Sequence, residues 1–305
     1  GQGSLMMGCA NMVSHWFTLN RGLAMSLMAL GFGASMAVHP PLSQYLVNEI
    51  GWRNAWFAMG LITWITMVPP LLLLVFDKPE DVGLRPDGEA PAKATDEAEG
   101  PAEISGLTLS EALRTPTFYI LALVWFAIAM LVTTLHFYQV KVVTDQGLSK
   151  EAAASLFTIS ALTMVGMMPL VGRMFDKLRT RYVVTLALVV TALNLAGITF
   201  VTSYATGIAY ALMFGLNNAL SMTMFGYIWP RYFGRKHLGS IQGTGQMVGV
   251  FGASLGPLPV GLAYDLVGNA TVTLQALAIF PAAAAILTLL FLRAPANLTE
   301  SAHLE

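Results

Sequence analysis

Long stretches without a charged side chain dominate this sequence. A helix of about 20 residues crosses a hydrocarbon core of about 30 Å. With 55% hydrophobic and 11% charged residues, the chain is more apolar than an ordinary soluble domain. We therefore predict an all-α, multi-pass membrane protein. Eight windows of 20 to 27 residues contain no Asp, Glu, Lys or Arg: 22–48, 54–76, 117–140, 152–172, 182–201, 206–230, 238–264 and 270–292.

A ninth apolar window, 1–17, opens the chain without an initiator Met or a charged flank. It is typical of a helix entered partway rather than of a signal peptide. We therefore expect nine transmembrane helices, in a chain truncated at its amino terminus.

Basic residues are distributed unequally between the loops. When the loops are assigned alternately to the two faces, thirteen of the 16 Lys and Arg residues fall on one face, and only Arg53, Lys141 and Lys150 fall on the other. Loops rich in Lys and Arg stay in the cytoplasm. The thirteen-charge face, with the carboxy terminus, is predicted to be cytoplasmic, in a plasma membrane and most simply a bacterial inner membrane.

An internal repeat indicates how the helices are organised. The word FGAS occurs at 32–35 and again at 251–254, and Pro-Leu follows both copies, at 41–42 and at 257–258. A nearly constant offset over several features is the mark of a duplicated unit. The copies lie in the second and eighth helices, so the period is six helices. The sequence thus predicts helices 4 to 12 of a twelve-helix protein with two parallel halves.

An acidic segment separates the halves. Residues 77–111 carry ten of the 17 acidic residues together with many Pro, Gly and Ala, a composition typical of a solvated linker. The predicted organisation is 1–76 for the rest of the first half, 77–113 for a cytoplasmic linker, 114–294 for the second half and 295–305 for a cytoplasmic tail.

Several motifs resemble one family. WFTLNRGLAMSLMALGFGAS, GWRNAWF, YFGRKHLGSIQG and GRMFDKLRTR occur in the order and spacing of the major facilitator superfamily, and resemble monocarboxylate transporters and bacterial oxalate and formate exchangers. The resemblance implies a helical bundle whose halves rock around a midplane site. It also implies a secondary active transporter of a small organic solute, such as a monocarboxylate or another organic anion, driven by proton symport or by exchange.

The motif GRMFDKLRTR supplies the expected gating residues, Gly172, Asp176, Lys177 and Arg181. In the resembled family the acid pairs with a neighbouring helix end or an arginine and holds one state of the gate. Arg179 stands here where the family has an inner glycine. The alternative is an ordinary solvated loop.

Small residues follow one side of the window 238–264. Small residues at helical spacing let a facing backbone approach closely. We expect a tight contact, used by moving helices, although static packing of the bundle would explain the pattern equally well. The residues are Gly245, Gly249, Gly252 and Gly256, with Gly33 in the first FGAS copy.

Polar residues inside the predicted spans are the candidates for solute contacts, because polar groups there are costly unless they face water or one another. Asn11, His136 and Asn217 lie on helices that line the central cavity in the resembled family. Gln246 and its neighbour Gln242 could bond across the halves. The alternative for each Asn is an interhelical hydrogen bond. His136 could also carry a proton.

One position departs from the resembled transporters. An intramembrane arginine of monocarboxylate transporters aligns with Met168, and no window contains a charge. An anion needs a countercharge or several donors in a low-dielectric site. Either preceding helices supply a cation, or the solute is not a simple carboxylate.

Three functional classes stay open: a secondary active transporter, a passive facilitator, and a non-transporting membrane sensor or partner subunit. We do not expect an enzyme, since the sequence shows no nucleophile motif, metal cluster or phosphate loop. The expected partners are the bilayer, a small solute and protons as coupling ion, with no cofactor, metal or nucleic acid, in a monomer.

Overall fold

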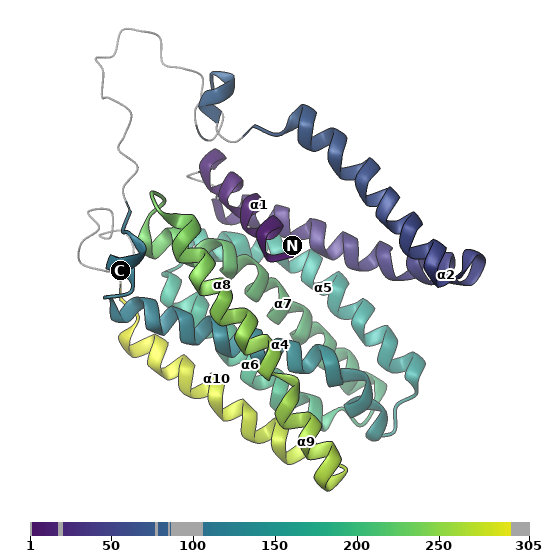
Figure 1. The fold of residues 1–305 in the computed structure, drawn as a ribbon. Helices are drawn as coiled ribbons and strands as arrows, with labels where there is room; N and C mark the ends of the chain where they lie inside the picture. Colours follow the sequence, from purple (N-terminus) through teal and green to yellow (C-terminus); the bar gives the residue numbers. More distant parts are fainter. Residues whose placement is uncertain (1, 18–20, 77–78, 85, 87–105, 294–305) are drawn as a thin grey trace.

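The computed structural model describes residues 2–17, 21–76, 79–84, 86 and 106–293, and this part of the chain is built of helices (Figure 1). A bilayer offers no hydrogen-bond partner to a peptide group, so each spanning segment must satisfy its own backbone. Among the described residues the one β-type contact is an isolated bridge between Gly106 and Gly234. The predicted all-α architecture is confirmed to this extent.

The amino-terminal segment consists of α1 (Gln2–Trp16) and α2 (Arg21–Leu74). Inside α2 the backbone leaves helical geometry at Gly51, with φ 74° and ψ 160°. Only glycine adopts this positive φ without a steric cost. The kink divides α2 into two arms, which correspond to the windows 22–48 and 54–76.

The carboxy-terminal bundle begins after the short elements η1 (Pro79–Val82) and α3 (Leu109–Ala112). It comprises α4 (Pro116–Asp145), α5 (Lys150–Lys177), α6 (Thr180–Gly197), η3 (Ile198–Phe200), α7 (Tyr204–Phe233), α8 (Leu238–Leu255), α9 (Pro257–Val267) and α10 (Thr271–Phe291).

Local sequence sets several helix starts. The side chains of Thr115, Ser149 and Ser203 each accept a hydrogen bond from a backbone N–H in the first turn of α4, α5 and α7 respectively. Such caps satisfy amide groups that have no partner within the helix. The helices therefore begin close to the starts of the apolar windows.

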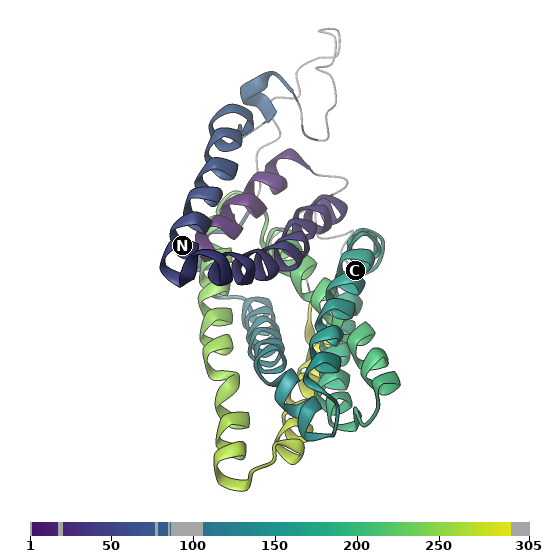
Figure 2. The ribbon, with the colours of Figure 1, turned by 90° about the vertical axis from the view of Figure 1, so that its right-hand side faces the viewer.

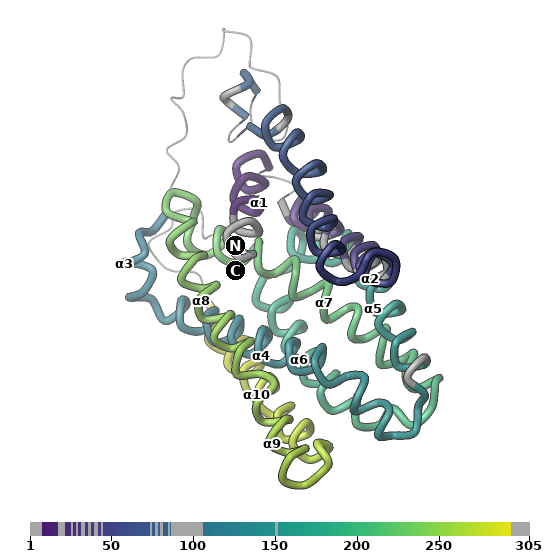
Figure 3. Tube along the Cα trace, turned by 45° about the vertical axis from the view of Figure 1, so that its right-hand side comes forward, coloured from purple at the N-terminus to yellow at the C-terminus, as the bar shows by residue number. Residues whose placement is uncertain are grey.

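Within the bundle α5 packs on α7, α6 on α10, and α8 on α4. The core has two parts along the helices: one near the linker end contains Phe118, Trp229 and Phe233, and the other contains Leu156 and Phe214. The amino-terminal segment lies across one side of the bundle (Figures 2 and 3).

Three glycines of α8 and its C-cap, Gly256, bring this helix against its neighbours. A Cβ at Gly245 would overlap the ring of Trp229, and one at Gly249 would overlap the indole of Trp125. At Gly252 it would lie 2.7 Å from the carbonyl oxygen of Phe126. The predicted close approach therefore exists, and it joins α8 to α4 and α7 of the same bundle. The surroundings of Gly33 lie outside the described residues.

Seven segments of the described chain are long and apolar enough to span a bilayer: Tyr45–Leu73, Pro116–Asp145, Ala152–Lys177, Thr180–Phe200, Tyr204–Phe233, Leu238–Val267 and Thr271–Phe291. α1, with 15 residues, is not among these seven segments. Most of the first arm of α2 is helical but also lies outside them. The expected total of nine spans stays a prediction.

Replacing Gly256 by Ala tests the contact between α8 and α4. A Cβ there would overlap the carbonyl oxygen of Met130 and come within 2.9 Å of the Thr134 hydroxyl, which donates to the Gly256 carbonyl. We expect the thermal unfolding midpoint of purified protein to fall, because overpacking costs about 1–3 kcal/mol. Gly166→Ala is the control, since a Cβ at Gly166 meets no described atom within 4 Å. Equal midpoints for both variants would contradict this packing.

Candidate functional site

The amino-terminal segment meets the bundle along two seams. α1 contacts α8 and α7, while α2 contacts α5 and α7. Figure 2 shows these helices crossing the bundle at the end where α8 begins. Side chains on both seams are the candidates for function, because any relative movement of the two parts must change them.

Asp176 lies at the seam between α2 and α5. Its Oδ1 accepts a hydrogen bond of 3.0 Å from the backbone N–H of Gly22, in the first turn of α2. Gly22 is buried, and a Cβ there would lie 2.5 Å from that Oδ1 and 2.6 Å from the carbonyl oxygen of Gly172. A carboxylate is stabilised at a helix N-terminus by the unpaired amides and by the helix dipole. The structure thus brings Gly172 and Asp176 together around Gly22.

The other residues of the loop motif have different surroundings. Lys177 is exposed at the end of α5. Arg181, in the first turn of α6, donates to the hydroxyl of Tyr182 at 3.2 Å. Of the four predicted gating residues, Gly172 and Asp176 contact the start of α2.

A second contact links the turn before α8 to the end of α1. Arg235 Nη1 donates to the backbone carbonyl of Ser14, 3.2 Å away, in the last turn of α1. A cation is stabilised at a helix C-terminus for the same dipolar reason that favours an anion at the other end. We did not predict this contact. Gly234 ends α7 with a φ of 75°, and the basic Arg235 follows it directly. A glycine followed by a basic residue is the sequence signal that marks this turn.

Asn11, Gln242 and Gln246 form a group that we call the carboxamide seam. The Nδ2 atom of Asn11 would lie 3.8 Å from a Cβ on Gly239, which places Asn11 against the start of α8. Gln242 and Gln246 follow Gly239 at spacings of three and seven residues, on the same side of the helix. The seam therefore joins the amino-terminal segment to the bundle through neutral side chains.

Several buried atoms of this seam have no hydrogen-bond partner among the described residues. They are Asn11 Oδ1, both amide atoms of Gln242, and Gln246 Oε1. Gln242 is only 1% exposed. Most buried polar side-chain atoms in proteins are paired, so these atoms require an explanation.

Asn217 lies elsewhere. It is completely buried between α7 and α6, where its Oδ1 accepts a hydrogen bond of 2.8 Å from the hydroxyl of Thr191. This is the interhelical contact considered as the alternative from the sequence. The amide nitrogen of Asn217 is buried and has no hydrogen-bond partner among the described residues. A role of Asn217 in solute binding stays a prediction.

His136 lies in the second half of α4, with its ring 4.9 Å from that of Phe214. Its Nδ1 is 2.8 Å from the carbonyl oxygen of Val132. Because a carbonyl can only accept, Nδ1 carries the hydrogen and Nε2 of the neutral ring is left as an acceptor. By its side-chain surface, His136 is an exposed residue of α4.

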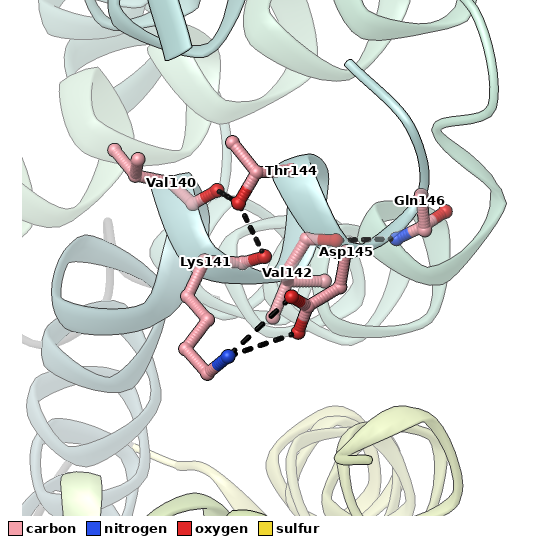
Figure 4. A network of polar contacts seen from close by, with 6 residues as sticks. All are labelled: Val140, Lys141, Val142, Thr144, Asp145 and Gln146. Carbon is pink, nitrogen blue, oxygen red and sulfur yellow. Dashed lines mark hydrogen bonds and ion pairs between the residues drawn. The ribbon is translucent and has the colours of Figure 1, made fainter. Parts of the chain in front are cut away.

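Met168, at the position of the arginine in the resembled transporters, is fully buried in the core. A charge there would have to be paired within the bundle. Figure 4 shows Lys141 and Asp145 at the far end of α4. Both side chains are exposed, the two residues are four positions apart, and Lys141 Nζ lies 3.4 Å from Asp145 Oδ1. Such exposed pairs contribute little stability, and this one belongs to the helix end.

A cavity of about 310 Å³ lies between the two arms of α2, lined by His39, Ser43, Val47, Ala55, Trp56 and Met59. His39 Nδ1 is 2.9 Å from the hydroxyl of Ser35, one turn away. Trp56 is 76% exposed, and most large apolar side chains of the second arm of α2, such as Phe57 and Trp64, are exposed as well. The cavity therefore lies at the periphery, away from both seams.

Comparison with known proteins agrees with the helical architecture. A protein from Thermoproteus tenax, described as an uncharacterized 38 kDa protein in 23S RNA operon, is 28% identical over 296 residues, which cover 94% of this chain and 67% of that protein. The family model of the Major Facilitator Superfamily matches residues 1–257 and, a second time, residues 140–304. Since the first match covers more than half of the residues, the chain belongs to the Major Facilitator Superfamily, a family of membrane transporters.

Proposed function

We propose that this chain is a secondary transporter that moves a small organic solute across a membrane by alternating access. Two contacts support this proposal: Asp176 on the start of α2, and Arg235 on the end of α1. Each contact joins the amino-terminal segment to the bundle. Both occur where α1 ends and α2 begins, so they close the same end of the protein.

The strength of these contacts suits a gate. A charge at a helix end contributes about 0.3–1 kcal/mol, and up to about 2 kcal/mol when it is partly buried. A change of about 1.4 kcal/mol alters an equilibrium tenfold. Two such contacts can therefore favour the closed state without preventing it from opening during a transport cycle.

The closed end carries the turns 177–180 and 233–238, which hold basic residues of the thirteen-charge face. Under the positive-inside rule this end faces the cytoplasm. We therefore assign the structure to a state closed toward the cytoplasm, in a plasma membrane such as a bacterial inner membrane, with the carboxy terminus on the cytoplasmic side. The bilayer, the solute and protons are the proposed partners of a monomeric protein.

Removing the charge of Asp176 should open this end. Ser14 is 1% exposed and lies at the Arg235 contact, so Ser14→Cys in a Cys9→Ser background provides a buried reporter thiol. We expect Asp176→Asn to raise the rate at which a membrane-impermeant maleimide labels this thiol by about tenfold, if about 1.4 kcal/mol is lost. The label is added from the linker side.

Three further variants accompany this experiment. Lys177→Gln changes a neighbouring exposed charge and should leave the labelling rate unchanged. Gly22→Ala should increase the labelling rate, because its Cβ would displace the Asp176 carboxylate. Gly31→Ala is its control. A Cβ at Gly31, in the same helix, meets no described atom within 4 Å, so this variant should leave the labelling rate unchanged. Labelling that is insensitive to both Asp176→Asn and Gly22→Ala would show that this contact does not hold the gate.

His136 is the proposed proton carrier among the described residues, since its Nε2 is an acceptor. We expect proteoliposomes containing the wild type to accumulate solute against a gradient when the pH differs across the membrane. His136→Gln should still equilibrate the solute but lose the pH dependence. His237→Gln, which changes an exposed histidine before α8, is the control.

Passive facilitation is the second candidate, because the carboxamide seam is built of neutral amides, which do not carry a proton. A facilitator would equilibrate the solute at every pH gradient, in the wild type as in His136→Gln. A membrane sensor of this fold would show no uptake at all. The uptake measurement therefore separates the three classes.

A further inference from the structure

The carboxamide seam has unpaired polar groups where two moving parts meet. Gln242 is almost completely buried, yet neither its amide nitrogen nor its amide oxygen has a partner in the described part of the chain. It lies on α8 between the glycine strip, which packs on α4 and α7, and the side that meets α1. The indole nitrogen of Trp229, whose ring packs on Gly245 one turn away, is likewise buried and unpaired among the described residues.

Leaving these groups unpaired is costly. A buried donor or acceptor without a partner costs about 1–3 kcal/mol, whereas an apolar side chain of the same shape is neutral or stabilising. The three carboxamides and one indole therefore weaken the closed seam. The presence of these unpaired polar groups is explained if a molecule that enters the seam supplies the missing hydrogen bonds.

The chemistry of the seam limits that molecule. Each carboxamide offers an acceptor oxygen and a donor nitrogen, whichever way the group is turned. A carboxylate only accepts, so it would leave the amide oxygens of Asn11, Gln242 and Gln246 unpaired. Hydroxyl groups donate and accept, and they can satisfy both kinds of atom.

Two arginines lie toward the end of the protein where the seam is. Arg235 donates to the end of α1. Arg231, in the last turn of α7, lies 5.6 Å from the ring of Tyr227, and its Nε has no hydrogen-bond partner among the described residues. Both belong to the closed cytoplasmic end. The position where the resembled transporters have their arginine is the buried Met168.

We propose that the carboxamide seam binds an uncharged, polyhydroxylated solute through Asn11, Gln242 and Gln246, with the indole of Trp229 as an additional donor. This inference rests on the proposed transport function and names its substrate class. Gln242 contributes the largest share, because both of its amide atoms lack a hydrogen-bond partner among the described residues.

Uptake into proteoliposomes tests the substrate class. The probes are two polyols, erythritol and mannitol, and two carboxylates, lactate and oxalate. We expect saturable polyol uptake by the wild type and at least about a tenfold loss of it in Gln242→Leu and Gln246→Leu, the loss that about 1.4 kcal/mol of binding free energy produces. Gln275→Leu is the matched control, since Gln275 is an exposed carboxamide on α10 that bonds Thr199.

Thermal unfolding distinguishes a binding role from a structural one. Gln242→Leu removes two unpaired buried atoms, so its unfolding midpoint should rise by about 2–4 °C while polyol uptake falls. A glutamine that only supported packing would give a lower midpoint instead. A lower midpoint, or unchanged polyol uptake in Gln242→Leu, would overturn this inference.

The same uptake experiment separates this inference from the proposed function. Uptake of lactate or oxalate without erythritol or mannitol would overturn the substrate class and leave the transport proposal standing. Uptake of none of the four probes would count against transport and against this inference together.

Discussion

The approach of α8 to the backbone of α4 is the contact on which the rest of the bundle depends. In a bilayer the hydrophobic effect does not hold helices together, because lipid tails are as apolar as leucine side chains. Dispersion and close packing must do so instead, and they require small residues. Gly252 and Gly256 let α8 reach the carbonyl groups of α4, while Gly245 and Gly249 leave room for two tryptophan rings. Those rings are thereby fixed between α4, α7 and α8.

The contacts of the amino-terminal segment include close packing of Gly22 on Asp176 and Gly172 and of Met25 on Gly226, but they also include polar groups. That segment meets the bundle at a carboxylate, a guanidinium and several carboxamides, each near a helix end or a seam. Charge contacts with helix ends are weak enough to break and directional enough to form again. Under the proposed transport cycle, these polar contacts are the ones that break when the amino-terminal segment moves against the bundle.

The carboxamide seam illustrates how stability and the proposed function oppose each other. An apolar residue at Gln242 would remove unpaired atoms from a buried site. Under our proposal it would also remove groups that bind the solute. Natural proteins keep such unfavourable groups mainly where function needs them.

Much of this architecture could be predicted from the sequence, but only the tertiary structure decided which polar residues share a neighbour. The motif around Asp176 indicated a partner at a helix end, and the structure identifies it as the N–H of Gly22. Asn217 was predicted beside a cavity and is bonded to Thr191. The sequence by itself determined the helices and their glycine-lined side, since those depend on local hydrogen bonding and on lipid. The periodicity of a helix shows which residues share one of its sides, but it does not show which other helix packs against that side. The contact of Asn11 with α8 and that of Arg235 with α1 join residues more than 200 positions apart, and only folding brings them together.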